Sequence, residues 1–142
     1  MRMILLSALA LASCSGPKAP DAEAPGLVLG DLAGTWSMEG MPIDHDTVVA
    51  TATVIGEGDP LVFTENFPGA DPVPLDVTVA GDSVIMTNGP FPSDMRPGVM
   101  VSTDAVYRMV GSRLVGLLNA HYDGDTTADS LLRFRVTMTR VR

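Results

Sequence analysis

The sequence is short of several residue types on which stability or catalysis often depends. It has one Cys and two His in 142 residues, and aromatic side chains make up 5%. A single Cys cannot form an internal disulfide or supply a cysteine-based zinc site. Nine basic residues against seventeen acidic ones give a formal charge of −8, which argues against nucleic-acid binding, since that needs a basic face. A hydrophobic share of 46% indicates one globular domain rather than a disordered acidic tail.

Long hydrophobic runs are also scarce. The apolar run at residues 3–12 is shorter than the ~20 residues that a membrane-spanning helix needs, but it has the length of a secretory signal and follows Arg2. Leu11-Ala12-Ser13-Cys14 comes next and resembles the lipobox of bacterial lipoproteins. In that family the Cys is acylated and the signal is removed in front of it. The resemblance implies a signal peptide at residues 1–13 and lipidation of Cys14.

The same resemblance implies a location. Several acyl chains on Cys14 would make a stable membrane anchor. Ser15, rather than an Asp, follows the Cys, which by similarity to lipoprotein sorting implies the outer membrane, on either face. Residues 14–26 hold three prolines and no large apolar side chain, so we expect a flexible spacer ahead of a domain at 27–142. An ordinary signal peptide that happens to contain a Cys is the alternative.

The rest of the chain has the pattern of short strands separated by turn residues. Alternating apolar and polar positions and β-branched runs predict eight strands, and no stretch shows a helical period. The strands are expected at residues 32–41, 47–55, 61–66, 73–79, 83–87, 99–109, 113–122 and 131–141. The fold class is therefore all-β, a single antiparallel up-and-down barrel of about eight strands, with a sandwich as the alternative.

A Trp near the start of the domain and an Arg near its end carry a family resemblance. Gly34-Thr35-Trp36 resembles the Gly-x-Trp signature in the first strand of the calycin superfamily, which includes lipocalins, fatty-acid-binding proteins, avidins and bacterial metalloprotease inhibitors. In those barrels the Trp closes one end, and a late Arg or Lys packs across its indole. The resemblance implies a lipocalin-like barrel closed by Trp36 and Arg140. From the residues alone, an ordinary core Trp and a solvated strand-end Arg are an equal alternative.

An eight-stranded barrel encloses either packed side chains or one small ligand. We predict that one apolar parity of the strands forms the interior wall and, with it, the ligand-binding surface. Its members are Trp36, Met38, Phe63, Leu75, Val77, Val84, Met86, Leu132, Phe134 and Val136. A barrel filled by aliphatic side chains, with no cavity, is the alternative.

These expectations combine into a membrane-anchored, non-enzymatic lipoprotein whose barrel binds or carries a small apolar ligand. One alternative is a protein-binding module similar to protease-inhibiting calycins, which would act through the spacer or through residues 89–98. The other is a structural envelope lipoprotein.

The sequence carries no signal for catalysis, a metal or a cofactor, and we expect none of them. Asp44-His45-Asp46 and His121-Tyr122-Asp123 pair imidazoles with carboxylates, but their separation matches no metal-site spacing. Asp123-Gly124-Asp125 with Asp129 lacks the Gly and Glu positions of a calcium loop. No nucleophile elbow, phosphate-binding loop or dinucleotide fingerprint occurs.

Residues 89–98 hold three prolines, which predict a stiff loop that cannot be a central strand. This loop would present Phe91 and Met95 either as a lid and contact surface or as a plug for the end of the barrel.

Charge is unevenly distributed along the chain. Thirteen acids and one base lie at residues 15–95, and seven Arg and four acids at residues 96–142. We expect the arginines to pair across strands with acids such as Asp76 and Glu39. An exposed basic strip formed by Arg133 and Arg135 is the alternative.

Lipidation is directly testable. Metabolic labelling with a radioactive fatty acid is expected to label the wild-type protein, and Cys14→Ala is expected to abolish the label because the acceptor thiol is lost. An unlabelled wild-type protein would contradict the anchor.

Overall fold

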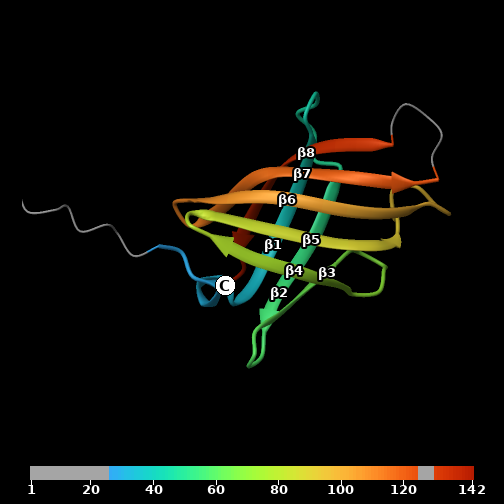
Figure 1. The fold of residues 1–142 in the computed structure, drawn as a ribbon. Coiled ribbons are helices and arrows are strands. Elements are labelled where there is room, and N and C mark those ends of the chain that lie inside the picture. Colours follow the sequence, from blue (N-terminus) through green and yellow to red (C-terminus); the bar gives the residue numbers. More distant parts are fainter. Residues whose placement is uncertain (1–25, 125–129) are drawn as a thin grey trace, which may run out of the picture.

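The computed structural model describes residues 26–124 and 130–142, which form a closed antiparallel barrel of eight strands joined in chain order (Figure 1). A short 3-10 helix, η1 (Leu29–Leu32), precedes the barrel. The strands are β1 (Gly34–Pro42), β2 (Ala50–Glu57), β3 (Val62–Asn66), β4 (Val73–Ala80), β5 (Ser83–Pro92), β6 (Met100–Val110), β7 (Arg113–Asp123) and β8 (Leu131–Arg140). This confirms the predicted fold class, and the sandwich alternative is wrong. The predicted signal peptide and nearly all of the spacer lie outside the described residues.

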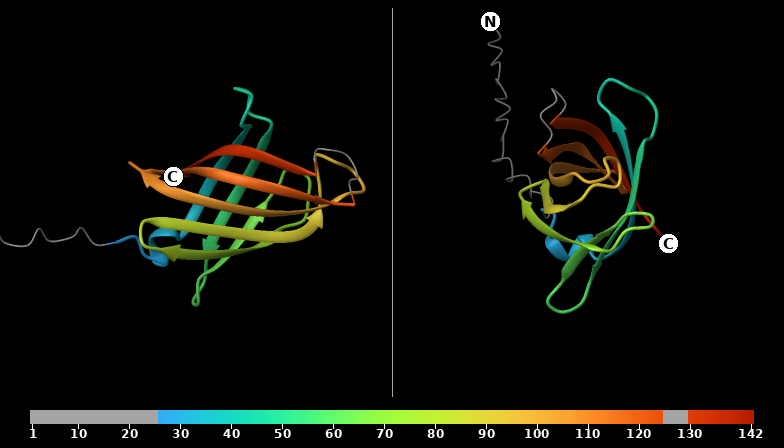
Figure 2. Two further views of the ribbon diagram at one scale, coloured as in Figure 1. Left: turned by 45° about the horizontal axis from the view of Figure 1, so that its top comes forward. Right: turned by 90° about the vertical axis from the view of Figure 1, so that its right-hand side faces the viewer.

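Pairing of the last strand with the first closes the barrel. Seven consecutive residue pairs join β1 and β8, from Trp36 opposite Arg140 to Pro42 opposite Phe134. The C-terminal end therefore lies beside the start of β1, where the Val141 backbone N–H donates a hydrogen bond to the carbonyl of Thr35 at 2.8 Å. Figures 1 and 2 show the closed barrel from three sides. A closed ladder leaves no unpaired strand edge between β1 and β8.

The end of the barrel at the start of β1 is sealed by a Trp–Arg pair. Trp36 is 2% exposed, and its indole Nε1 donates a hydrogen bond to the carbonyl of Leu32 at 3.0 Å. The Arg140 guanidinium lies 4.4 Å from the centre of the indole ring and donates to the carbonyls of Asp31 and Ala33. These contacts tie β8 and η1 to one side chain of β1.

The opposite end, which we call the mouth, carries the longer connections. Residues 43–49, 67–72 and 93–99 join β1 to β2, β3 to β4 and β5 to β6 there. Arg135 on β8 donates to the carbonyl of His45 and to the Asp46 carboxylate, both at 2.8 Å, and so fixes the first connection to the outer wall. Two exposed arginines thus pair with acids in connections and turns: Arg135 with Asp46, and Arg108 with Asp82 at 3.8 Å.

The prediction that residues 89–98 form a loop is wrong for their first part. Strand β5 continues to Pro92, and the loop begins at Ser93. Pro90 and Pro92 are tolerated in this strand because β5 pairs only with β6 beyond Asn88. On the side that β4 has left, no neighbouring strand needs a backbone N–H donor from β5. The register between β5 and β6 shifts between Asn88 and Phe91, and Gly89 lies at this shift with a φ of +99°. A side chain does not fit there, because a Cβ on Gly89 would lie 2.7 Å from the carbonyl oxygen of Val101.

The strand predicted from residue 47 begins only at Ala50. Val48 and Val49 are β-branched, which favoured a strand, but they lie exposed in the connection. Tertiary context therefore overrides local propensity at this position.

The core is formed by the inward parity of all eight strands. Eight of the ten predicted wall residues are buried, and Val77 and Leu132 are half-buried against the same core.

No helix among the described residues has the length and the hydrophobicity of a membrane-spanning segment.

The Trp36–Arg140 contact predicts a measurable contribution to stability. Arg140→Met removes the cation–π interaction, worth about 1 kcal/mol, and two hydrogen bonds to carbonyls, worth about 1 kcal/mol each. We expect urea unfolding of the full chain to show a loss of about 2–3 kcal/mol. Arg108→Met is the matched control: its ion pair is exposed, so its loss should change the free energy of unfolding little. Equal effects of the two substitutions would contradict the closing role of Arg140.

Candidate functional site at the barrel mouth

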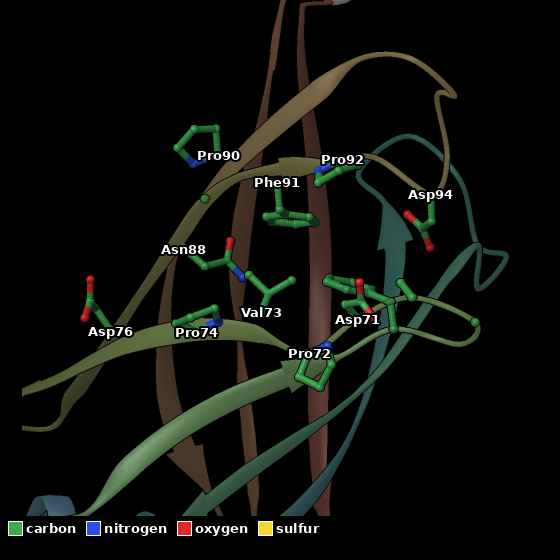
Figure 3. Close-up of a pocket in the computed structure, with 14 residues that line it drawn as sticks. Asp71, Pro72, Val73, Pro74, Asp76, Asn88, Pro90, Phe91, Pro92 and Asp94 are labelled. Carbon is green, nitrogen blue, oxygen red and sulfur yellow. The ribbon is translucent and has the colours of Figure 1, made fainter.

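Strands β4 and β5 separate toward the mouth and leave a groove in the wall. Their ladder ends where Leu75 faces Asn88, and β4 continues toward β3 while β5 continues with β6. The groove has a volume of about 640 Å³ and includes Pro72, Pro74, Pro90 and Pro92 in its lining. Figure 3 shows Phe91 above Val73, with Asn88 beside them.

The groove is acidic. Asp71, Asp76 and Asp94 line it, and none of its lining residues is Lys, Arg or His. Figure 3 shows Asp76 and Asp94 on opposite sides of Phe91. A positively charged ligand would therefore be favoured over a negatively charged one.

Two aromatic rings separate the groove from the interior of the barrel. Phe67 and Phe91 stack with their ring centres 5.4 Å apart and an interplanar angle of 24°. Both rings line the groove and also a smaller interior cavity. A rotation of these side chains would connect the two spaces.

Two small cavities lie in the described part of the barrel, and the larger one opens toward the mouth, where the exposed Asp94 and Met95 line it. The cavity nearer the mouth has a volume of about 50 Å³ and is lined mainly by apolar side chains, among them Met38, Leu118 and Phe134. At about 10–15 Å³ for each water, it has room for about three to five waters. A second cavity of about 10 Å³ lies along Val54, Leu75 and Met86. The barrel is thus mostly filled by side chains.

A buried carboxyl group lies between these cavities. Glu65 on β3 is 3% exposed and lines both of them. Asn88 on β5 donates a hydrogen bond from Nδ2 to Glu65 Oε2, and Thr103 on β6 donates from Oγ1 to Asn88 Oδ1 at 2.6 Å. The hydrogen-bond chain therefore runs from β6 through β5 and ends on the Glu65 carboxyl.

Burial changes the proton affinity of this group. Desolvation raises the pKa of Glu65 to about 7, the hydrogen bond from Asn88 opposes the rise, and the negative charge of Asp94 adds to it. The pKa of the Tyr107 hydroxyl is also raised, first by its own burial and then by the charge of Glu65. Glu65 consequently changes its ionisation near neutral pH.

The loop at residues 93–99 lies over the mouth. Met95 Sδ lies 4.0 Å from the Tyr122 hydroxyl, and the Arg96 guanidinium lies 4.1 Å from the centre of the Tyr122 ring. Ser93 is buried and accepts a hydrogen bond from the Arg96 backbone N–H at 3.0 Å. Phe91 is buried at the mouth, whereas Met95 is 41% exposed. Phe91 alone therefore plugs the end of the barrel, and the loop covers this end only in part.

The structure brings some of the predicted wall residues to the cavities. Met38, Phe134 and Val136 line the larger one, and Met38, Leu75 and Met86 the smaller one. Trp36, Phe63 and Val84 are buried but line neither, and the same holds for the half-buried Val77 and Leu132.

Sequence reasoning missed the polar centre of the site, Glu65, Asn88 and Thr103, as well as Tyr122. One signal was available for Glu65, because it shares the inward parity of β3 with Phe63. An acidic residue on an apolar parity is a candidate for a buried functional group.

The histidines lie outside this site. His121 Nε2 is 2.6 Å from Asp104 Oδ1, and the hydrogen bond from Asn119 to Asp104, followed by contact with His121, lowers the pKa of Asp104. His45 lies in the exposed β1–β2 connection. Within residues 26–124 and 130–142 no three metal-ligating side chains come together. The acidic pattern predicted at residues 123–129 lies largely outside the described residues.

No protein-family model matches this chain, and no curated protein or solved structure matches it either. The site is therefore assigned from its geometry and chemistry.

The raised pKa of Glu65 predicts a pH-dependent stability. The folded state holds the Glu65 proton between pH 4.5 and about 7 more tightly than the unfolded state, so stability falls as pH rises through this window. Glu65→Gln removes this dependence. We expect the free energy of unfolding of the wild type, relative to the variant, to decrease by about 3 kcal/mol between pH 4.5 and pH 8.

Urea unfolding of both proteins across this pH range measures the difference, and Glu39→Gln on the exposed side of β1 provides the baseline. A constant difference between wild type and Glu65→Gln would contradict a raised pKa.

Proposed function

We propose that this protein is a membrane-anchored, non-enzymatic binding protein that holds a small, largely apolar ligand at the mouth of its barrel. The observation that supports the proposal best is the continuous arrangement of an open groove, a pair of stacked phenylalanines and a mostly apolar interior cavity. A concave, mainly apolar surface with a few convergent polar groups is typical of small-molecule sites.

The volumes specify how such a ligand would lie. The interior cavity of about 50 Å³ accepts only a small group, whereas the groove of about 640 Å³ accepts a larger one. A ligand would therefore insert one end past Phe67 and Phe91 and leave the remainder in the groove. Met38 and Met95 line the interior cavity with flexible side chains that adapt to different shapes.

The anchor follows from the lipobox resemblance at Cys14, and the outer membrane from Ser15. A lipid anchor would hold the barrel close to a membrane, which is a source of apolar molecules. A lipocalin-like assignment rests on the closed eight-stranded barrel together with the Trp36–Arg140 contact.

A second candidate function is the binding of a protein segment. The open groove favours it, because four prolines and two exposed aspartates, Asp71 and Asp76, form an accessible surface along strand β4 and the end of β5. Such a partner would depend on the groove and not on the interior cavity. A purely structural envelope role is the third candidate and would require neither space.

Filling the cavity separates these functions. In Ala120→Leu, three additional carbon atoms occupy the interior cavity, which Ala120 lines. We expect the full chain, made by cell-free synthesis without lipid, to bind the apolar fluorophore N-phenyl-1-naphthylamine. The variant should bind it about tenfold more weakly or worse, since an occupied cavity cannot accept the inserted end of the probe.

Leu117→Ala is the matched control, because Leu117 is 55% exposed on the outer wall and would affect only adsorption to the outside. Equal probe binding by the wild type and Ala120→Leu would contradict binding inside the mouth, and a loss confined to Leu117→Ala would identify adsorption.

A further inference from the structure

The carboxyl group of Glu65 is the one charged end of an otherwise neutral polar network inside the described barrel. It is 3% exposed, and the other members of the network, Asn88 and Thr103, are uncharged. No Lys, Arg or His is among the residues that line the two interior cavities. A buried carboxylate normally has a cationic partner, because burial without one is costly.

We propose that the ligand of this site is an apolar amine in its protonated form, whose ammonium group enters the interior cavity and pairs with the Glu65 carboxylate. This inference rests on the proposed function of the mouth and specifies the class of ligand that it takes.

The direction of the hydrogen bonds supports a donor as ligand. Thr103 donates to Asn88, and Asn88 donates to Glu65 Oε2, so the network already ends on an acceptor. A carboxylate accepts several hydrogen bonds, and the remaining sites of Glu65 border the two cavities. An ammonium group offers three donors and the compensating charge, whereas a carboxylate ligand would offer neither.

The space and the surrounding charge agree with this class. A cavity of about 50 Å³ accepts a compact ammonium group and its first carbon atoms, and the groove accepts the apolar remainder. Phe67 and Phe91 provide ring faces along this path, to which a cation is attracted. Asp71, Asp76 and Asp94 make the approach through the groove negative.

Binding should then depend on pH. The titratable groups that line the interior cavities are Glu65, Asp94, Tyr107 and Tyr122, all of them acids. Burial raises the pKa of both tyrosines above its ordinary value, so they stay neutral near pH 7. Arg96 lies over the ring of Tyr122 and is not among the residues that line the larger cavity. Ionisation of Glu65, with a pKa of about 7, therefore controls the change in affinity between pH 6 and pH 8.

The test compares three six-carbon probes that differ only in their head group. Hexylammonium, hexanol and hexanoate are titrated by calorimetry into the cell-free full chain at pH 8 and pH 6. We expect hexylammonium to bind best at pH 8, about tenfold better than at pH 6, because the ionised fraction of Glu65 changes about tenfold. Hexanol should bind more weakly and without this pH dependence, and hexanoate should bind weakest.

Two variants assign the effect to Glu65. Glu65→Gln is expected to weaken hexylammonium binding about tenfold and hexanol binding much less, since only the amine loses a charge pair. Asp82→Asn, in the exposed turn before β5, removes the same charge far from the mouth and should have no effect. Hexanoate as the best binder, hexylammonium binding no tighter than hexanol, or the same loss in both variants would overturn the inference.

The outcomes also distinguish this inference from the proposed function. Probe fluorescence that responds to Ala120→Leu without a preference for hexylammonium would leave the binding function standing and overturn the ligand class. Absence of binding for the fluorophore and all three hexyl probes would overturn both.

Discussion

Closure of β8 onto β1 is the constraint on which the other features of this barrel depend. The register that sets Trp36 opposite Arg140 matches the inward parity of β8 to that of β1, and a slip of one residue would turn the apolar side of β8 outward. The same register fills one end with the indole and its guanidinium partner. The mouth is left as the end at which the interior cavities meet a groove.

At the mouth, the β4–β5 ladder ends early, at Leu75 and Asn88. Prolines and a left-handed Gly89 let β5 leave β4, and the wall opens beside a carboxyl group that the barrel has buried. Natural proteins depart from regular geometry and from full apolar burial mainly at functional sites. Here a gap in the ladder and a buried acid, Glu65, occur at the same place, which is why we propose ligand binding there.

The sequence alone predicted the barrel well and its site poorly. Eight strands alternate clearly enough to be recognised, because each buries only one face in a single core. The sequence predicts a loop at residues 89–98, whereas β5 extends to Pro92. Prolines are tolerated there because β4 no longer pairs with β5, and this separation depends on the tertiary fold, not on a local sequence pattern. The network from Thr103 to Glu65 joins three strands, and only the barrel register brings its members together. The predicted lipid anchor at Cys14 remains a prediction from four residues of sequence.

The most direct test of the central claim is to measure the pKa of the Glu65 carboxyl by NMR of the 13C-labelled side chain, with and without hexylammonium. The account predicts a value near 7 in the free protein and a clear decrease when the amine is bound, since a bound cation favours the ionised form. A value near the ordinary 4.5 in the free protein, or one that hexylammonium leaves unchanged, would contradict it.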